Sequence, residues 1–495
     1  MHLKPPLAPW RTFFSDQKVI LTSIRAKNKF LSKNIKLNII QEQSKLNLSN
    51  KIQIKDASIN SKLIKKNDIF FAIKGKNLDG NNYISEAIKK KSSFVIVNRF
   101  NKNHPLSKQI KVKNTLKFLT TCSSILRENI NAKIISITGS CGKTTLKEMI
   151  GLVLKKISRT SFSPKSFNNK YGVPLSLFNM KQSDHFGVFE IGMDKKGEID
   201  NLSKIIKPDL GLITNISYAH SKNFKNIKQI ADAKAEIMNN IKKNGIIVLN
   251  GDDHFFHYLK GLALKKKLKV ISFAINNNSS EIKLLSVKKT KNKYELFLDI
   301  NNNKFSFYTK NNNKNNLYNI LAATACITSF VNIKKLKKGI FLNINIPKGR
   351  GNIFDVNFEN KKIYFVDESY NSNPLSLKSS IENFEKIESR KSKKYMFLGD
   401  MLELGKHSIK QHKLISKIIN KTKINKVYVI GKHIKETYKG LNPNKKAKIL
   451  KNKLDMLKII KDDFKTGDYL MVKGSNSTGL NKFIIDLKQR RQNVI

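Results

Sequence analysis

The sequence contains few residues of several kinds, and each scarcity excludes a class of protein. Its three cysteines, Cys122, Cys141 and Cys326, lie far apart and match no metal-binding spacing. We therefore expect no disulfide framework and a reducing, cytoplasmic compartment. No run of 18 apolar residues occurs, so we expect no membrane span. The basic, proline-containing N-terminus also lacks the continuous apolar core of a secretory signal.

Acidic residues are also scarce. The chain has 36 Asp and Glu against 95 Lys and Arg, which gives a formal net charge of +59. Such an excess favours nucleic-acid binding. However, the basic residues are spread along the chain, lysine greatly exceeds arginine, and the aromatic motifs of RNA-binding domains are missing. We interpret the charge as compositional drift that causes nonspecific polyanion binding, and we predict no specific nucleic-acid partner.

The length of 495 residues is enough for about three domains. Residues 1–29 form a basic extension of unknown role. Residues 30–130 contain short strands and helices, which predict a small α/β domain. Residues 131–346 alternate strand and helix, which is typical of a doubly wound, mostly parallel sheet. Residues 347–495 repeat this pattern and predict a Rossmann-like domain, but they contain no G-x-G-x-x-G dinucleotide motif.

The stretch Ile134–Met149 predicts a strand, a glycine-containing turn and a helix. The turn is a shortened phosphate-binding loop, in which glycines let the backbone approach an anion. The N–H groups at the helix start would hold phosphate oxygens. Lys143 would neutralise the outer phosphates, and the Thr144 hydroxyl would bind Mg²⁺. The predicted ATP-binding residues of the loop are Gly139, Ser140, Cys141, Gly142, Lys143, Thr144 and Thr145.

Two more polar residues lie at the ends of later predicted strands. Glu190 lies in the strand Phe186–Ile191, and His220 follows the strand Leu210–Ile216. Ligands of open α/β sheets bind beyond the carboxyl ends of the strands, so we expect both residues to converge with Thr144. A hydroxyl, a carboxylate and an imidazole suit one or two Mg²⁺ ions beside a triphosphate. Taken singly, each residue has the alternative of an ordinary surface charge or loop contact.

A series of segments occurs in the order of a known family: TGSCGKTTLKEM, SFNNKYGVPLSL, VFEIGMDKKGEI, LITNISYAH, AKAEI, KGRGNIF, VDESYNSNPLS, LGDMLELG and VKGS. From about residue 30 to its end, the chain resembles the Mur ligases of peptidoglycan synthesis, and it is most similar to the branch that adds D-alanyl-D-alanine. The resemblance implies three domains, which bind the UDP precursor, ATP and the incoming dipeptide in that order. It implies a monomeric enzyme that uses ATP and Mg²⁺ to join UDP-N-acetylmuramoyl-tripeptide to D-alanyl-D-alanine through an acyl phosphate.

The resemblance also assigns roles to individual residues. The implied catalytic residues are Lys143, Lys234 and His220. The implied magnesium ligands are Thr144, Glu190, His220 and Lys234, the last as a carbamate. The implied ATP contacts outside the loop are Asn316, Arg350 and Asp367. The implied substrate contacts are Ser61, Asn168, Asn169, Tyr370, Asn371, Asn373, Asp400, Lys473 and Ser475. For Lys234 the alternative is a solvated charge on a helix.

The sequence departs from the family pattern at a few positions. These are Asn60 and Lys62 in the first domain, Asn315 where a histidine is usual, and Asn476 where an arginine is usual. Two other functions stay open: another Mur-type amino acid ligase on the same fold, and a nucleic-acid-stimulated P-loop ATPase. The third residue of the tripeptide, diaminopimelate or lysine, is not indicated.

Overall fold

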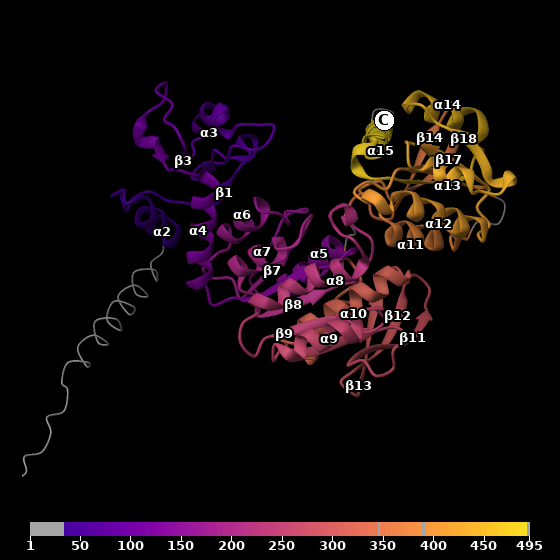
Figure 1. Ribbon diagram of the computed structural model, residues 1–495, viewed down its shortest axis with the longest axis horizontal. Coiled ribbons are helices and arrows are strands. Elements are labelled where there is room, and N and C mark those ends of the chain that lie inside the picture. The colour runs from indigo at the N-terminus through magenta and orange to yellow at the C-terminus, as the bar shows by residue number, and fades with distance from the viewer. Residues whose placement is uncertain (1–33, 345–346, 389–391, 493–495) are drawn as a thin grey trace, which may run out of the picture. The chain divides into compact units, whose positions relative to one another are not determined.

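The computed structural model describes residues 34–344, 347–388 and 392–492 (Figure 1). The predicted extension, residues 1–29, lies outside the described residues. The chain divides into two compact units: Met1–Ala132 with Phe167–Gly187, and Lys133–Ser166 with Val188–Ile495. In the part of the chain that is described, no helix is both long enough and apolar enough to cross a membrane.

The first unit contains a four-stranded parallel sheet. Its strands follow chain order: β1 (Ala57–Ser58), β2 (Ile69–Phe71), β3 (Phe94–Val97) and β4 (Gln109–Lys111). Its helices are α2 (Ile35–Ser44), α3 (Ile84–Lys89), α4 (Thr115–Glu128) and α6 (Gly172–Phe178). Strands β2 and β3 are buried at every position and consist entirely of apolar residues, as is typical of strands in a parallel sheet.

Helix α6 belongs to the first unit although its sequence follows the phosphate-loop helix. The hydroxyl of Ser123 in α4 donates a hydrogen bond to the carbonyl of Pro174 in α6 (2.8 Å). The Asn179 side chain bonds both backbone groups of Ala57, at 2.6 and 2.9 Å. The segment Phe167–Gly187 is therefore joined to the N-terminal sheet, whereas the sequence pattern predicts it within the central domain, residues 131–346. The domain boundaries themselves stay a prediction.

The second unit contains two sheets. The larger has nine strands in the order β13-β12-β11-β10-β9-β8-β5-β7-β6. These are β5 (Lys133–Thr138), β6 (Thr160–Phe162), β7 (Phe186–Glu190), β8 (Leu210–Ile213), β9 (Ile246–Asn250), β10 (Lys269–Ala274), β11 (Ile282–Lys289), β12 (Tyr294–Ile300) and β13 (Asn303–Thr309). Its helices are α5 (Lys143–Lys155), α7 (Glu198–Ile206), α8 (Ile227–Ala235), α9 (Phe256–Lys265) and α10 (Lys314–Thr328).

Strand β5 lies at the point where the strand order of this sheet reverses. The chain continues from β5 to β6 and β7 on one side, and then returns to β8, β9 and β10 on the other. Strands β5, β8, β9 and β10 are parallel, so their carboxyl ends meet at one edge. Ligands of such sheets bind in the crevice at this reversal, which places the site just beyond Thr138.

The smaller sheet of the second unit has six strands in the order β14-β15-β19-β16-β17-β18. These are β14 (Asn352–Phe358), β15 (Lys361–Asp367), β16 (Lys394–Gly399), β17 (Lys426–Ile430), β18 (Lys446–Ile449) and β19 (Tyr469–Lys473). Its helices are α11 (Pro374–Glu385), α12 (Ser408–Asn420), α13 (Lys435–Lys439), α14 (Lys453–Asp463) and α15 (Leu480–Gln492). All neighbours pair in parallel except β14 with β15.

Alternate residues of the C-terminal strands build two separate cores. Phe365 and Val472 pack toward α14 and α15, whereas Val366 and Met471 pack toward α11 and α12. This follows from the two-residue period of a strand. Figure 1 shows α11 and α12 on one side of this sheet and α14 on the other. The sheet is therefore covered on both faces, as the sequence pattern predicts.

Candidate active site

The phosphate-binding loop joins β5 to α5. Gly139 and Gly142 have φ values of 141° and 82°, which favour glycine. A Cβ at Gly139 would overlap the Thr214 hydroxyl. Helix α5 begins at Lys143, whose amine folds back and donates to the Gly139 carbonyl at 2.8 Å. The structure thus places the lysine amine over the loop, at the start of α5.

The segment that follows β8 holds this loop in shape. The Cys141 N–H donates to the Asn215 side chain (2.9 Å), and the Thr214 hydroxyl donates to the Cys141 carbonyl (2.6 Å). The Ser140 hydroxyl donates to the Ser217 carbonyl (2.9 Å). These bonds fix the loop backbone before any ligand binds. One of the partners, Asn215, is not among the site residues predicted from the sequence.

Three segments converge on the Thr144 hydroxyl. Thr144 donates to the Glu190 carboxylate at 2.7 Å, and its oxygen lies 3.2 Å from the Ser166 hydroxyl. The guanidinium of Arg350 donates to the same Thr144 oxygen at 3.1 Å. Thr144 and Glu190 are both buried. The predicted convergence of these two residues is found, and their hard oxygen atoms fit a Mg²⁺ ion.

Lys234 lies at the end of α8 and is almost completely buried, with 1 % of its surface exposed. The alternative of a solvated charge on a helix is therefore wrong for this residue. Burial lowers the pKa of Lys234 well below its usual value, and the positive charge of Lys143 lowers it further. The lowered pKa favours the neutral amine, which is the form that reacts with carbon dioxide to give a carbamate.

His220 lies in the loop after β8 and has a left-handed backbone with φ of 53°. Its Nδ1 atom lies 3.1 Å from the Asp194 carboxylate and 2.8 Å from that of Glu403. Burial acts to lower the pKa of His220, but the two carboxylates beside Nδ1 outweigh it and the pKa is raised. The ligand atoms of the three side chains lie within 4.8 Å of one another, and both carboxylates lie on the Nδ1 side of the His220 ring.

The loop after β15 lies against the phosphate loop. The Tyr370 ring stacks under the Arg350 guanidinium at 4.4 Å, and its hydroxyl donates to Ser166 at 2.7 Å. The Cys141 thiol donates to the Asn373 side chain at 3.1 Å. Asn373 also begins α11 with a reciprocal capping box. Two of the predicted substrate residues, Tyr370 and Asn373, are therefore in contact with the phosphate-loop region.

The remaining predicted residues of the C-terminal sheet bond to neighbouring groups of the same sheet and its loops. The Asp367 carboxylate accepts hydrogen bonds from Lys488 (2.7 Å) and the Ser369 hydroxyl (2.6 Å). The buried Lys473 amine donates to the Asn371 carbonyl at 3.1 Å. Asp400 accepts from the backbone N–H groups of 432 and 434, and Ser475 from that of 402. These residues follow the carboxyl ends of β15, β16 and β19, and their roles toward ligands stay predictions.

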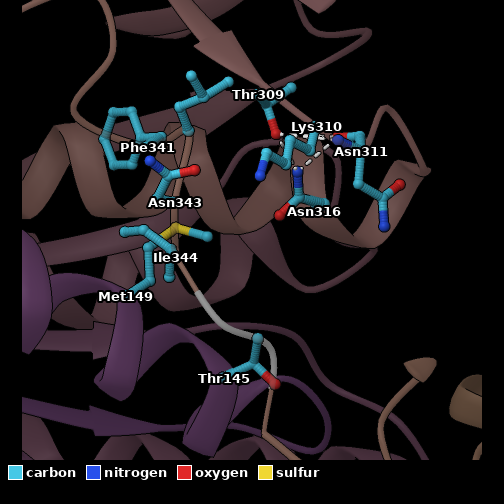
Figure 2. Close-up of a pocket in the computed structure, with 10 residues that line it drawn as sticks. Thr145, Met149, Thr309, Lys310, Asn311, Asn316, Phe341, Asn343 and Ile344 are labelled. Carbon is cyan, nitrogen blue, oxygen red and sulfur yellow. Dashed lines mark hydrogen bonds between the residues drawn. The ribbon is translucent and has the colours of Figure 1, made fainter. Parts of the chain in front are cut away.

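A cavity of about 140 Å³ lies beside α5 and α10 (Figure 2). Asn316 lines it, and its side chain donates to the Thr309 hydroxyl (3.0 Å) and the Asn311 carbonyl (2.6 Å). The full lining comprises Thr145, Met149, Thr309, Lys310, Asn311, Asn316, Phe341, Leu342, Asn343 and Ile344. Because Thr145 also belongs to the phosphate loop, the cavity begins where that loop ends.

The remaining predicted residues lie in the first unit. Ser61 is buried and donates to the Glu86 carboxylate at 2.6 Å. Asn169 accepts from the N–H groups of Tyr171 and Gly172, which shapes the start of α6. Asn168 is half-buried in the same loop. Their assignment to the substrate stays a prediction.

Sequence reasoning missed three acidic or hydroxyl side chains that the structure brings to this region: Ser166, Asp194 and Glu403. Each lies inside a quoted motif, namely SFNNKYGVPLSL, VFEIGMDKKGEI and LGDMLELG. The motifs therefore contained the signal, but only the tertiary structure shows which member of each motif reaches the site.

Alkylation of Cys141 is expected to block nucleotide binding, because the added group would lie in the phosphate loop. Burial raises the pKa of the Cys141 thiol, so we expect slow reaction at neutral pH and faster reaction at higher pH. ATP should protect the residue. Iodoacetamide labelling followed by mass spectrometry and activity assay tests this.

The variant Cys141→Ser is the control for alkylation, since Cys122 and Cys326 are buried. It should resist inactivation. Complete labelling of Cys141 with full retained activity would contradict the placement of phosphate in this loop.

The fold and the phosphate-loop site define an α/β protein of the Mur ligase family, and the chain belongs to this family. Residues 137–327 match the Mur ligase middle domain, and residues 350–476 match the Mur ligase glutamate ligase domain. A UDP-N-acetylmuramoyl-tripeptide–D-alanyl-D-alanine ligase of Rickettsia prowazekii is 32% identical over 445 residues, 89% of this chain and 96% of that protein. The ligase of the same name from Buchnera aphidicola subsp. Acyrthosiphon pisum is 33% identical over 452 residues, which cover 88% of this chain and 93% of that protein.

Solved structures support the fold. A crystal structure of MurF from Acinetobacter baumannii has a TM-score of 0.77 and 24% identity, and covers 91% of this chain and 98% of that chain. MurF ligase from Thermotoga maritima, in complex with ADP, has a TM-score of 0.74 and 22% identity. The match covers 90% of this chain and 100% of that chain. The predicted family and the predicted three-part α/β architecture are confirmed.

Proposed function

We propose that this chain joins D-alanyl-D-alanine to UDP-N-acetylmuramoyl-tripeptide with the conversion of ATP to ADP and phosphate. The observation that carries the proposal is the convergence of Glu190, Ser166 and Arg350 on the Thr144 hydroxyl of the phosphate loop. This convergence joins the phosphate loop to an arginine that lies just before β14, the first strand of the C-terminal sheet. The curated relatives named above support the choice of substrates.

The chemistry requires that two anions meet. The substrate carboxylate attacks the γ-phosphorus of ATP and forms an acyl phosphate, with ADP as the leaving group. The dipeptide amine then attacks the carbonyl carbon and loses a proton. Phosphate leaves from the tetrahedral intermediate, and an amide remains. Phosphorylation is needed because a carboxylate oxygen is otherwise too poor a leaving group.

The chain supplies positive charge where these anions meet. The Lys143 amine lies over the phosphate loop, and the Arg350 guanidinium lies 3.1 Å from the Thr144 hydroxyl. Fixed cations stabilise charge that develops during phosphoryl transfer. Thr144, Glu190, His220 and a carbamylated Lys234 would hold Mg²⁺, which would screen the repulsion between carboxylate and phosphate. The oxygen donors of Thr144 and Glu190 and the buried Lys234 amine, whose pKa is lowered, fit this assignment.

The cavity beside Asn316 is the proposed place of the nucleotide base. It begins at Thr145, one residue after the proposed magnesium ligand, and is lined by both apolar and amide side chains. Apolar walls with a few polar groups suit a flat heterocycle. Asp367 is proposed as a further ATP contact of the C-terminal sheet.

The other predicted residues are proposed to bind the remaining substrates. Ser61, Asn168 and Asn169 would contact the UDP-sugar peptide. The loops at the carboxyl ends of β15, β16 and β19 would contact the dipeptide, through Tyr370, Asn371, Asn373, Asp400, Lys473 and Ser475. Ligands of parallel sheets bind at such strand ends, which supports this choice.

We propose further that the enzyme is monomeric and cytoplasmic and acts without nucleic acid. The three free cysteines suit a reducing compartment. Light scattering after size exclusion tests the oligomeric state.

Phosphate release tests the proposed function. The purified chain, ATP and Mg²⁺ are incubated with UDP-N-acetylmuramoyl-tripeptide, with and without D-alanyl-D-alanine, and the product is identified by mass spectrometry. We expect sustained phosphate release only with both substrates. Ligation of a single amino acid instead would favour another Mur-type ligase. Phosphate release that needs only RNA or DNA would favour a nucleic-acid-stimulated ATPase.

Arg350→Ala is expected to lower kcat by about 10²-fold, because a charge contact made in the transition state is lost. The KM for the UDP-sugar peptide should change little, since Arg350 contacts Thr144 and Tyr370 at the proposed ATP site. Steady-state kinetics with each substrate varied in turn gives both constants.

Lys348→Ala is the matched control for Arg350, because it removes an exposed cation two residues away. It should keep nearly full turnover. An Arg350→Ala enzyme with normal kcat would show that the C-terminal sheet does not complete the ATP site.

A further inference from the structure

Two loops of the second unit interlock at the edge of the candidate site. The first, residues 218–224, follows β8 and is called the His220 loop; the second, residues 402–407, follows β16 and is called the Glu403 loop. The Lys222 N–H donates to the Glu403 carbonyl at 2.9 Å. The Ser221 hydroxyl donates to the Leu404 carbonyl at 3.3 Å. The loops belong to different sheets, so these bonds join the nine-stranded sheet to the six-stranded one.

The packing of the two loops is close. Ser221 and Leu404 are buried, with 0% and 1% of their surfaces exposed. Gly405 has a φ of 53°, and a Cβ at this position would lie 2.8 Å from the Lys222 Cα. Such a separation is too short for two carbon atoms, so the contact requires glycine. The rings of Tyr218 and His407 lie 4.9 Å apart at the side of the same contact.

The interlocked loops bring a carboxylate of one sheet to an imidazole of the other. Glu403 Oε2 lies 2.8 Å from His220 Nδ1, and Asp194 Oδ1 lies 3.1 Å from the same atom. Asp194 and His220 both follow strands of the nine-stranded sheet. Glu403 follows a strand of the six-stranded sheet, so it lies beside the ring only when the two loops are docked. Because Nδ1 faces these two carboxylates, Nε2 is the ring nitrogen that remains for a metal ion. Histidines that bind metals almost always donate their other N–H to a carboxylate or carbonyl.

We propose that Glu403 is a positioning residue that orients the His220 ring and thereby makes metal binding depend on docking of the C-terminal sheet. The inference rests on the proposed function, because it concerns the same ligase site. It explains why one loop supplies both the backbone bonds to the His220 loop and the carboxylate at the ring. A loss of Glu403 should weaken metal binding without removing a metal ligand.

Three variants separate the carboxylate from the docking contact. Glu403→Ala removes the side chain, while Glu403→Gln keeps an acceptor oxygen at the same reach without the charge. Gly405→Ala disturbs docking and leaves the carboxylate in place. The control is Glu382→Gln, which removes a half-exposed carboxylate from α11 of the same sheet, where it lies 3.9 Å from Lys378.

The first readout is Mn²⁺ binding in the presence of ADP, followed by electron paramagnetic resonance. Loss of an outer-shell partner costs roughly 10–100-fold in metal affinity. We therefore expect about tenfold or greater weakening in Glu403→Ala and in Gly405→Ala, a smaller loss in Glu403→Gln, and no change in Glu382→Gln. Unchanged Mn²⁺ affinity in Glu403→Ala would overturn the proposal.

The second readout is hydrogen exchange of peptides that cover residues 218–224. Exchange should be faster in Gly405→Ala, because the Lys222 amide loses its acceptor. Faster exchange in Gly405→Ala together with normal Mn²⁺ affinity would show that the loops can come apart without weakening metal binding. That result would also overturn the proposal. Neither readout uses turnover, so a wild-type chain that fails to ligate D-alanyl-D-alanine would refute the proposed function separately.

Discussion

Replacing Lys143 with alanine is expected to lower ligation by about 10²–10³-fold or more, because the variant loses the amine that lies over the phosphate loop. The fold should be kept. Lys143 is the first residue of α5 and is not part of the apolar core, so the substitution removes charge rather than packing. Phosphate release under saturating substrates measures the effect, and circular dichroism checks the fold.

Lys155→Ala is the control for Lys143, because it removes an exposed lysine from the last turn of the same helix. It should ligate at nearly the normal rate. In a chain with 95 basic residues this comparison separates a specific role from the loss of one charge among many. A folded Lys143→Ala protein with near-normal turnover would refute the assignment of the loop to phosphate.

Replacing Lys234 with alanine is expected to have a comparable effect. A carbamate converts the cation into an anionic oxygen donor, and the lowered pKa of Lys234 favours the neutral amine that forms it. Since loss of an outer-shell partner already costs about 10–100-fold, loss of a ligand should cost at least about 100-fold. Short carboxylates such as formate should restore part of the activity by filling the vacated position.

Removal of carbon dioxide gives an independent test of the same residue. Wild-type activity should fall in degassed, bicarbonate-free buffer and return when bicarbonate is added, whereas Lys234→Ala should not respond. Because protonation blocks carbamate formation, the return should be slower below the lowered pKa of Lys234 than above it. Lys228→Ala, an exposed lysine of the same helix, is the control. A Lys234→Ala enzyme that is fully active without carboxylate would refute the carbamate.

The parts of this site that could be predicted from sequence are those that depend on local rules. The β-branched run before Gly139 predicts a strand, which the structure shows as β5. The glycines and Lys143 predict the start of a helix, which the structure shows as α5. The convergence of Glu190 with Thr144 followed from strand ends meeting at one edge of a sheet. Each of these inferences needs only the residues within one strand–turn–helix unit and a general rule of sheet topology.

The parts that could not be predicted depend on long-range packing. Lys147 is completely buried, and its amine bonds the Ser163 and Lys165 carbonyls and the Glu148 carboxylate. In a chain so rich in lysine, nothing local separates it from the solvated lysines. It ties α5 to the segment that leads to Ser166, and so it supports the position of that hydroxyl beside Thr144.

The contact between His220 and Glu403 shows the same limit. The two residues are far apart in the chain and come together only because two loops from different sheets interlock. Likewise, Phe167–Gly187 follows the phosphate-loop helix in sequence but joins the N-terminal sheet through bonds of Ser123 and Asn179. Alternation of strand and helix cannot show to which sheet such a segment returns.

The central claim is that the chain activates a carboxylate as an acyl phosphate, and oxygen transfer tests it most directly. UDP-N-acetylmuramoyl-tripeptide is prepared with both oxygens of its reacting carboxylate as ¹⁸O, and is ligated to D-alanyl-D-alanine in unlabelled water. The account predicts that each released phosphate carries one ¹⁸O atom and that the new amide keeps the other. Phosphate without ¹⁸O, or label found in AMP, would contradict it.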